Sequence, residues 1–185
     1  IYVENTGAYT AEIGNATDFA LMNNTVSGTI KTIEPVINGA YASGHALTYD
    51  GKLYGWGGNG EGETGTSPDS PENWSNVPTP TLAVKNPNSS GTFQGDIVSI
   101  WNQSKRGQSR WAKTRDGRIW LTGDRQSYCT PFDAPGPAGA ASSGSGDLKN
   151  FTDVSLYFGD HTQTSNSVVW ASGSERATQV LMENG

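Results

Sequence analysis

A short segment in the first third of the sequence has the pattern of a tight β-hairpin. Residues 45–57 read His-Ala-Leu-Thr-Tyr-Asp-Gly-Lys-Leu-Tyr-Gly-Trp-Gly, with two short strand-like runs on either side of Asp50-Gly51. A type I′ turn needs positive φ at both central residues, and Asp-Gly adopts it at low cost. Gly57 then ends the returning run. The segment therefore predicts strand, turn and strand, which commits this part of the chain to antiparallel β structure.

The same pattern recurs further along the chain. Residues 111–123 contain a second Asp-Gly turn, and residues 161–173 turn at Asn166-Ser167. A slip of one residue would turn every side chain to the opposite face of a strand, so agreement at several positions predicts a repeated hairpin. Weaker echoes at 19–24 and 179–185 are interpreted as outer hairpins or degenerate units. The matched positions are Asp50/Asp116/Asn166, Tyr54/Trp120/Trp170 and Gly57/Gly123/Gly173.

Composition favours an all-β fold. The chain has 24 glycines, 10% aromatic and 34% hydrophobic residues, which suits many short strands joined by tight turns. Helical apolar spacing is interrupted everywhere by Gly, Pro or Asn. The single cysteine, Cys129, excludes an internal disulfide framework, so packing and hydrogen bonding must hold the fold. No apolar run approaches the roughly 18 residues of a membrane span, and membrane insertion is not expected.

The charge of the chain argues against a nucleic-acid partner. The formal net charge is -6, whereas phosphate binding needs a concentrated Lys/Arg face. One basic cluster exists, and it is interpreted as the solvated face of a hairpin. Its members are Lys105, Arg106, Arg110, Lys113, Arg115 and Arg118.

Longer segments carry a family resemblance. Residues 44–65, with their Gly-Trp-Gly-Gly-Asn-Gly tail, and the Val-Pro-Thr-Pro-Thr-Leu of residues 77–82 resemble the repeat of the regulator of chromosome condensation family. Residues 96–100 and 151–154 resemble the strand with which that repeat begins. The resemblance covers about residues 30 to 175. It implies a β-propeller-like array of antiparallel hairpin blades, incomplete in this chain because three clear units do not close the family's seven-bladed ring.

The resemblance also suggests how the chain is organised. Residues 1–29 form an N-terminal segment with a weak repeat echo, and residues 30–185 form the repeat domain. Its units span about 30–96, 97–150 and 151–185. Because the chain stops on a turn signal, we expect the natural protein to continue, or a further chain or homo-oligomer to complete the assembly.

No catalytic constellation is recognisable. The two histidines, His45 and His161, fall at the same repeat position, which favours a ring nitrogen bonded to backbone in each blade over catalysis. There is no Gly-x-Ser-x-Gly elbow, and Cys129 has no nearby histidine. We expect no enzyme activity, no metal site and no cofactor. Four loop acids remain as a remote candidate pair for glycoside hydrolysis: Glu61, Glu63, Asp69 and Glu72.

The long connections 58–96 and 124–150 are the predicted recognition surface, since binding residues concentrate on loops that a rigid scaffold displays. Trp74 with Asn73 is the first candidate contact and Tyr128 the second, because an aromatic ring flanked by polar groups can stack on a sugar. The alternative for Trp74 is a ring that pins the loop onto a blade. Three strand tryptophans are expected in the core or between blades: Trp56, Trp120 and Trp170.

The main functional hypothesis is a non-catalytic binding or adhesion module that recognises a cell-surface glycan or protein receptor. A viral tail fibre or bacterial surface protein is the expected setting, with an extracellular or virion location. Two alternatives are a polysaccharide depolymerase and an intracellular propeller scaffold that docks a protein partner. The family's nucleotide exchange and chromatin docking are not carried over, because the sequence has neither an inserted wedge nor a basic face.

Overall fold

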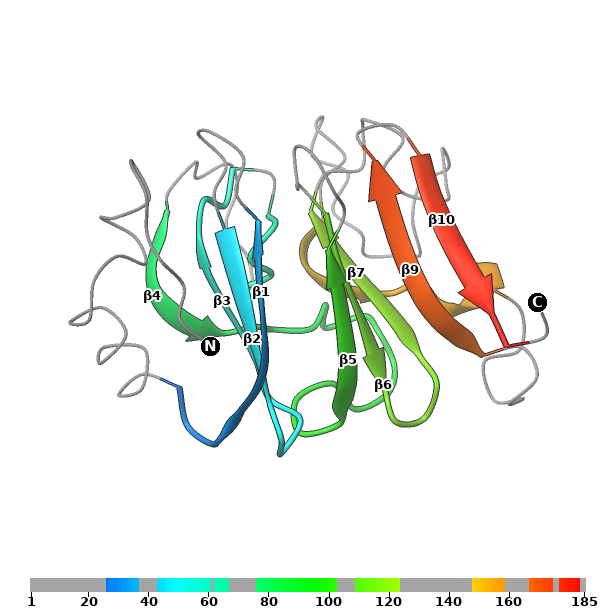
Figure 1. Cartoon of the computed structure of the whole chain (residues 1–185), viewed down its shortest axis with the longest axis horizontal. Coiled ribbons are helices and arrows are strands. Elements are labelled where there is room, and N and C mark those ends of the chain that lie inside the picture. The colour runs from blue at the N-terminus through cyan, green and yellow to red at the C-terminus, as the bar shows by residue number, and fades with distance from the viewer. Residues whose placement is uncertain are drawn as a thin grey trace.

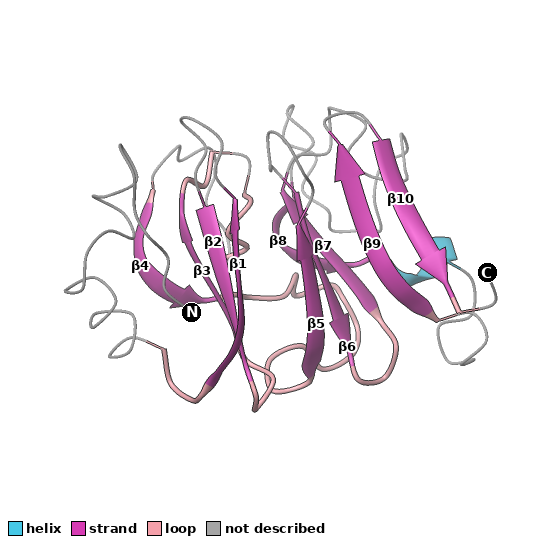
Figure 2. Ribbon diagram, in the orientation of Figure 1, coloured by secondary structure: helices cyan, strands magenta, loops and turns pink. Residues whose placement is uncertain are grey.

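The structure is a computed structural model. It describes residues 26–36, 43–60, 62–66, 76–102, 109–123, 148–158, 167–174 and 177–183. Ten strands and one 3-10 turn lie in these residues, and the strands form three antiparallel sheets that stand side by side (Figures 1 and 2). No described helix is long and apolar enough to cross a membrane.

The first two sheets have the same four-stranded design. Each runs in chain order, β1-β2-β3-β4 and β5-β6-β7-β8, with every neighbouring pair antiparallel. The first contains β1 (Ile30–Val36), β2 (Ser43–Thr48), β3 (Leu53–Gly57) and β4 (Val77–Leu82). The second contains β5 (Ile97–Asn102), β6 (Ser109–Thr114), β7 (Ile119–Gly123) and β8 (Leu148–Asp153).

The third sheet has two described strands. They are β9 (Val168–Ser174) and β10 (Ala177–Met182), and the 3-10 turn η2 (Ser155–Phe158) precedes them. The all-β, blade-like array predicted from the sequence is therefore confirmed.

The hairpin turns occur where Asp-Gly predicts them, but with a different geometry. Gly51 N donates to Thr48 O at 3.0 Å and Thr48 N donates to Lys52 O at 2.9 Å, so three residues form the loop. Gly51, with φ of 78°, closes it. The expected type I′ turn on Asp50-Gly51 is wrong: the i to i+3 bond spans Tyr49 and Asp50, and only the following glycine needs positive φ.

The second hairpin repeats this turn closely. Gly117 N donates to Thr114 O at 2.9 Å and Thr114 N to Arg118 O at 3.0 Å. The threonine hydroxyl also donates to the turn aspartate in both cases, at 2.5 Å for Thr48–Asp50 and 2.6 Å for Thr114–Asp116. A shared Thr-x-Asp-Gly pattern thus builds both turns from local contacts.

The third unit does not align with the first two as the sequence predicts. β9 pairs with β10, with Val168 opposite Met182 and Trp170 opposite Leu181, and the register shifts between them. The pairs β1–β2 and β5–β6 show the same register shift. In β1–β2 it follows the pair Ile30 and Thr48, and in β5–β6 it follows the pair Ile97 and Thr114. β9 is therefore the counterpart of the opening strands β1 and β5. The sequence predicts only a weak echo at residues 179–185; of these, residues 179–183 align with residues 45–49.

A backbone hydrogen bond supports this assignment at three places. Each bond joins the residue before an opening strand to the first residue after the second strand. The pairs are Tyr49 N to Thr29 O, Arg115 N to Asp96 O and Glu183 N to Ser167 O, each 2.9 Å long. The first strand of the predicted hairpin, with His161, and its turn at Asn166 lie outside the described residues.

Trp170 is consequently not the counterpart of Tyr54 and Trp120. Trp120 is fully buried and Tyr54 is 6% exposed, whereas Trp170 is 44% exposed. Its expected place in the core is wrong because it stands on an opening strand, on the face turned away from the second sheet. Trp56 and Trp120 are buried as expected.

The resemblance predicts an opening strand at residues 151–154, but residues 151–153 belong to β8. Trp120 pairs with Asp153 and Leu121 with Thr152 in the second sheet. The outer edge of β8 is covered by the connection that follows β4, since Phe151 N donates to Val84 O at 2.9 Å. The chain thus folds the first connection over the edge of the second sheet.

The core lies between the sheets. One buried cluster fills the space between the first and second sheets and includes Leu47, Phe93, Trp120 and Phe151. A second lies between the second and third sheets and includes Trp111, Ile119, Val168 and Ala171. Face-to-face stacking of twisted antiparallel sheets is the arrangement expected of propeller blades.

Candidate functional site

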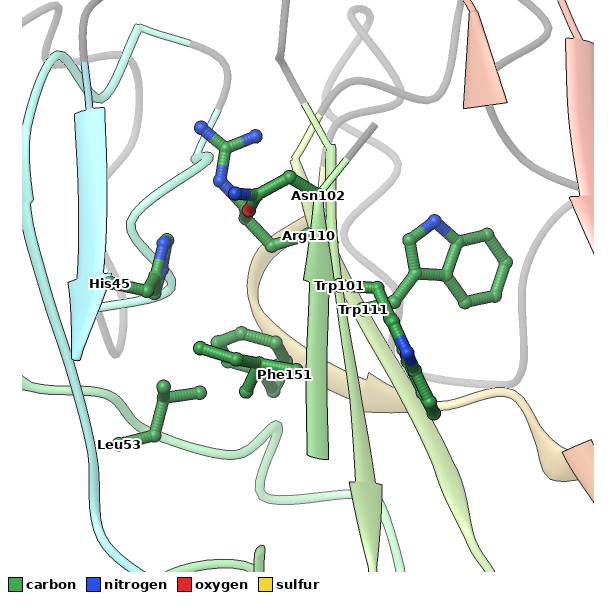
Figure 3. A pocket seen from close by; sticks show the side chains of 8 residues that line it. His45, Leu53, Trp101, Asn102, Arg110, Trp111 and Phe151 are labelled. Atoms are coloured by element: carbon green, nitrogen blue, oxygen red, sulfur yellow. The ribbon is translucent and has the colours of Figure 1, made fainter. Parts of the chain in front are cut away.

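The junction between the first two sheets holds the most unusual chemistry among the described residues. Charged and imidazole groups are buried there beside apolar side chains. Figure 3 shows His45 and Leu53 from the first sheet facing Phe151, with Arg110 and Asn102 above them. The space among these side chains is too narrow to admit a water molecule.

A glycine-rich segment lines this junction. Residues 57–59 and 62–65 are buried, although the sequence suggested an exposed polar loop here. Gly55 allows the close approach, because a Cβ on it would lie 2.3 Å from Thr64 O. Residues 57–60 and 62–65 therefore form a packed segment, called the wedge below, and the expectation that all of 58–96 displays recognition residues is wrong for this part.

The wedge also contacts the second sheet. Thr122 Oγ1 donates to Gly62 O at 2.8 Å, and Lys149 Nζ donates to Gly60 O at 3.4 Å. A Cβ on Gly65 would lie 2.5 Å from the ring of Phe151. Small residues in the wedge thus let two sheets approach a shared backbone segment.

Residues 76–96 are likewise not a free loop. They include β4, and the side chain of Gln94 fixes the stretch beyond it. Gln94 Oε1 accepts a hydrogen bond from Leu53 N at 3.0 Å. Gln94 Nε2 donates to Leu53 O at 3.1 Å and to Ala83 O. Phe93 is 3% exposed and packs on Trp120 with ring centroids 5.0 Å apart. This connection is a structural strap between the sheets.

Arg110 is the buried cation of the junction. It is 2% exposed, its Nη2 donates to Ser43 Oγ at 2.5 Å and its Nη1 donates to Ser109 O at 2.9 Å. Burial lowers the pKa of Arg110 to about 10, while the charges of Glu63 and Glu34 act in the opposite direction. The guanidinium stays charged at neutral pH and joins β6 to β2.

Two carboxylates complete this cluster. Glu63 is fully buried, and Glu34 accepts a hydrogen bond from Asn102 Nδ2 at 3.2 Å. Burial raises the pKa of Glu34, and the charge of Arg110 lowers it. Since removing one partner leaves a buried charge uncompensated, the cluster makes the two sheets depend on each other.

His45 has the structural role predicted for it. The ring is 1% exposed and lies 3.1 Å from Thr64 O through Nε2, so Nε2 carries the hydrogen and donates to the wedge. Burial, followed by the charge of Arg110, lowers the pKa of His45 to about 3. The imidazole is therefore neutral at physiological pH and is no general base here. In the observed register its counterparts are Trp111 and Gln179, not His161.

The basic cluster of the sequence is a solvated face only in part. The Arg115 side chain is 72% exposed, whereas Arg110 is buried. The described members other than Arg110 are tied to acceptors, and Lys105 and Arg106 lie outside the described residues. The contacts are Lys113 Nζ to Ser167 Oγ and Val168 O, Arg115 to Asp96, and Arg118 to Asp116 and Asp153.

The predicted contact residues Asn73, Trp74 and Tyr128 lie outside the described part of the chain. Of the four loop acids, only Glu63 is described, and it is buried rather than paired for hydrolysis. The described residues hold no group of three or more His, Cys, Asp or Glu side chains placed to bind a metal.

These features define the class of the fold: blades of a β-propeller, two of them four-stranded and a third with two described strands. The sequence matches no protein-family profile, and no curated protein sequence matches it.

Solved structures do resemble it. Prp20p from Saccharomyces cerevisiae matches at 20% identity with a TM-score of 0.58, over 84% of this chain and 32% of that one. The complex of Kap60 with yeast RCC1 (Prp20) matches at 18% identity with a TM-score of 0.58, over 84% of this chain and 30% of that one. Human WBSCR16 matches at 16% identity with a TM-score of 0.55, over 86% of this chain and 32% of that one. The chain thus spans about a third of these structures, and at such identities the likeness shows the fold alone.

Proposed function

We propose that this chain supplies blades to a propeller scaffold that docks a protein partner. The structural neighbours support this reading, since one is described by its binding to Gsp1p and histones and another is bound to Kap60. Fold by itself does not determine function, so the placement of the connections is the observation on which the proposal rests.

The connections from β3 to β4 and from β7 to β8 leave from the same end of the blades. The tight turns after β2 and β6 lie at the lower end in Figure 1, and the strands run from there to the opposite end. β1, β5 and β9 end at that opposite end, as do β3 and β7. The segments that contain Asn73, Trp74 and Tyr128 therefore start and finish at a common end, which favours a single docking face there.

Trp74 remains the proposed anchor, with Asn73 beside it and Tyr128 from the next blade. Tryptophan and tyrosine are enriched at the energetic centres of protein interfaces because they bury a large area at low conformational cost. The two blades that carry these connections form a rigid support, since the wedge and the buried arginine lock them together.

The first experiment separates a protein partner from a glycan. Extracts or surfaces that bind the purified chain would be treated either with a proteinase or with periodate, which destroys sugar diols. We expect proteinase to abolish binding and periodate to leave it intact. Loss after periodate alone would contradict the proposal and favour the adhesion hypothesis, with its extracellular or virion location.

Substitution then tests the face. Trp74→Ala should weaken partner binding several-fold, equivalent to about 1 kcal/mol, with little change in Tm. Trp120→Ala is the matched control, because that ring is fully buried and its loss should cost about 3 to 5 kcal/mol of stability. If Trp74→Ala melts the domain and spares binding, the loop ring is structural.

A further inference from the structure

The chain contains six Asn-x-Ser/Thr motifs, and the asparagines of three of them lie in the described residues. These three are Asn88, Asn102 and Asn150. Such a motif is the acceptor sequence for an N-linked glycan, which is bulky and polar and needs a place at the surface of the folded protein. The structure therefore separates the asparagines that leave room for a glycan from those that do not.

Asn150 leaves no room for a glycan. It lies in β8 and is 8% exposed, and Thr152, the hydroxyl residue of its motif, is 1% exposed. Thr152 Oγ1 accepts a hydrogen bond at 3.3 Å from Nδ2 of Asn86, which belongs to the segment that covers the outer edge of β8. A sugar on Asn150 would displace that segment, so this motif is part of the fold.

Asn102 is also engaged in the fold. It is the last residue of β5 and is half-buried. Its Nδ2, the atom to which a glycan would be attached, donates to Glu34 Oε2 at 3.2 Å. Figure 3 shows its side chain beside that of Arg110, at the junction between the first two sheets. A glycan on Asn102 would compete with this junction.

Asn88 has the exposure that the other two lack. Asn88 is exposed, and so is Ser90, the hydroxyl residue of its motif. Asn88 lies in a tight turn, which Ser89 N closes by donating to Asn86 O at 2.9 Å. The backbone N–H of Asn88 donates to Asn86 Oδ1 at 2.9 Å. Within the described part of the chain, no group bonds to the side-chain amide of Asn88, so its Nδ2 is open to solvent.

The turn that presents Asn88 is anchored to the second sheet. Asn86 is 4% exposed, and its backbone N–H donates to Phe151 O at 2.8 Å. Ser90 Oγ accepts from Arg118 Nη1 at 3.3 Å, and Arg118 directly follows the turn after β6. Asn88 is therefore held at the end of the blades that carries the tight turns, away from the end proposed for partner docking.

We propose that Asn88 carries an N-linked glycan. The donor is a lipid-linked oligosaccharide pyrophosphate, and the catalyst is an oligosaccharide transferase. The bond between the first sugar carbon and Asn88 Nδ2 forms as the bond between that carbon and the pyrophosphate oxygen breaks, and one amide proton leaves to a base of the transferase. The proposal includes passage of the chain through a compartment that holds this enzyme. It is independent of which partner the scaffold docks.

Peptide mass spectrometry of the natural protein tests the proposal. An amidase that releases N-linked glycans converts each glycosylated asparagine into aspartate, and heavy-oxygen water labels that aspartate. We expect the label at position 88 and none at position 150. An unmodified Asn88 in the natural protein would overturn the proposal, and so would a glycan on Asn150, because the burial that separates the two motifs would then have no effect.

Two matched variants made in the same cells test the motif itself. Ser90→Ala keeps Asn88 but removes the hydroxyl residue of the motif, and it should lose the mass of one glycan. Ser89→Ala keeps the motif and should retain that mass. Equal masses for the two glycans' carriers would contradict the assignment to Asn88. Each of these results leaves the docking proposal intact, because that is measured by proteinase sensitivity and by Trp74.

Discussion

Arg110 on β6 donates a hydrogen bond to Ser43 on β2, with Nη2 2.5 Å from Oγ, although 67 positions separate the two residues. This contact crosses the junction between the first two blades inside a buried cluster. It makes Arg110 a structural residue of the scaffold, where its charge had suggested a solvated surface.

Arg110→Met should destabilise the protein by about 3 to 5 kcal/mol, because the buried carboxylate of Glu63 loses its compensating charge. Combining it with Glu63→Gln should recover part of that loss, which urea unfolding of the two single variants and the double variant would measure as a coupling energy. Strictly additive losses would contradict the buried cluster.

Acid should weaken the fold through His45. Its folded pKa of about 3 lies below the unfolded value of 6.5, so the unfolded state takes up the proton first. The contribution of the neutral ring is fully present above pH 6.5 and is lost as pH falls toward 3, by about 1.4 kcal/mol per pH unit. The raised pKa of Glu34 acts in the opposite direction. The difference in unfolding free energy between the protein and His45→Asn should therefore shrink on acidification; a constant difference would refute this assignment.

Gly51 is required for two reasons. It has φ of 78°, and a Cβ there would lie 2.7 Å from the carbonyl carbon and oxygen of Gly95. Gly51→Ala should cost about 2 to 4 kcal/mol, from backbone strain plus overpacking. Gly95→Ala is the control, since Gly95 has φ of 87° but open space around its Cβ, and it should cost only about 1 kcal/mol. Equal melting temperatures for the two variants would show that the contact is unimportant.

The edge strand β4 is protected by its prolines. Pro80 in β4 occupies the position that Phe151 occupies in β8. The backbone N–H of Phe151 points outward from the sheet and donates to Val84 O. Proline has no such N–H, so β4 offers no donor at this position. Pro78 likewise has no N–H to donate. Replacing both prolines with threonine should promote edge-to-edge association, seen as a concentration-dependent rise in sedimentation coefficient. A variant that stays monomeric at high concentration would show that the prolines do not guard the edge.

Local chemistry explains what the sequence predicted correctly. The Asp50-Gly51 and Asp116-Gly117 hairpins follow from contacts within five residues, so the pattern is sufficient to find them. The alignment of the third unit is wrong because Trp170 matches an aromatic position by coincidence. Its true register depends on pairing between β9 and β10 and on their shared bulge, which no local pattern reports.

The candidate site was harder to predict for the same reason. Ser43, Glu34 and Glu63 come from three separate segments, and only the stacking of the sheets brings them to Arg110. The glycines of the wedge were recognised as turns, but their close approach to Thr64 O and Phe151 is a tertiary feature. Burial of charge at a blade junction therefore had no signal in the sequence beyond the presence of the residues themselves.

The register of the third blade is the central claim, since both the repeat design and the exposed position of Trp170 depend on it. Nuclear Overhauser contacts between the backbones of Val168 and Met182, and of Trp170 and Leu181, would measure it directly in solution. We predict both contacts, together with contact from Glu183 to Ser167. A spectrum lacking them, in which residues 168–173 instead pair with residues 161–165 about a turn at Asn166-Ser167, would contradict the account.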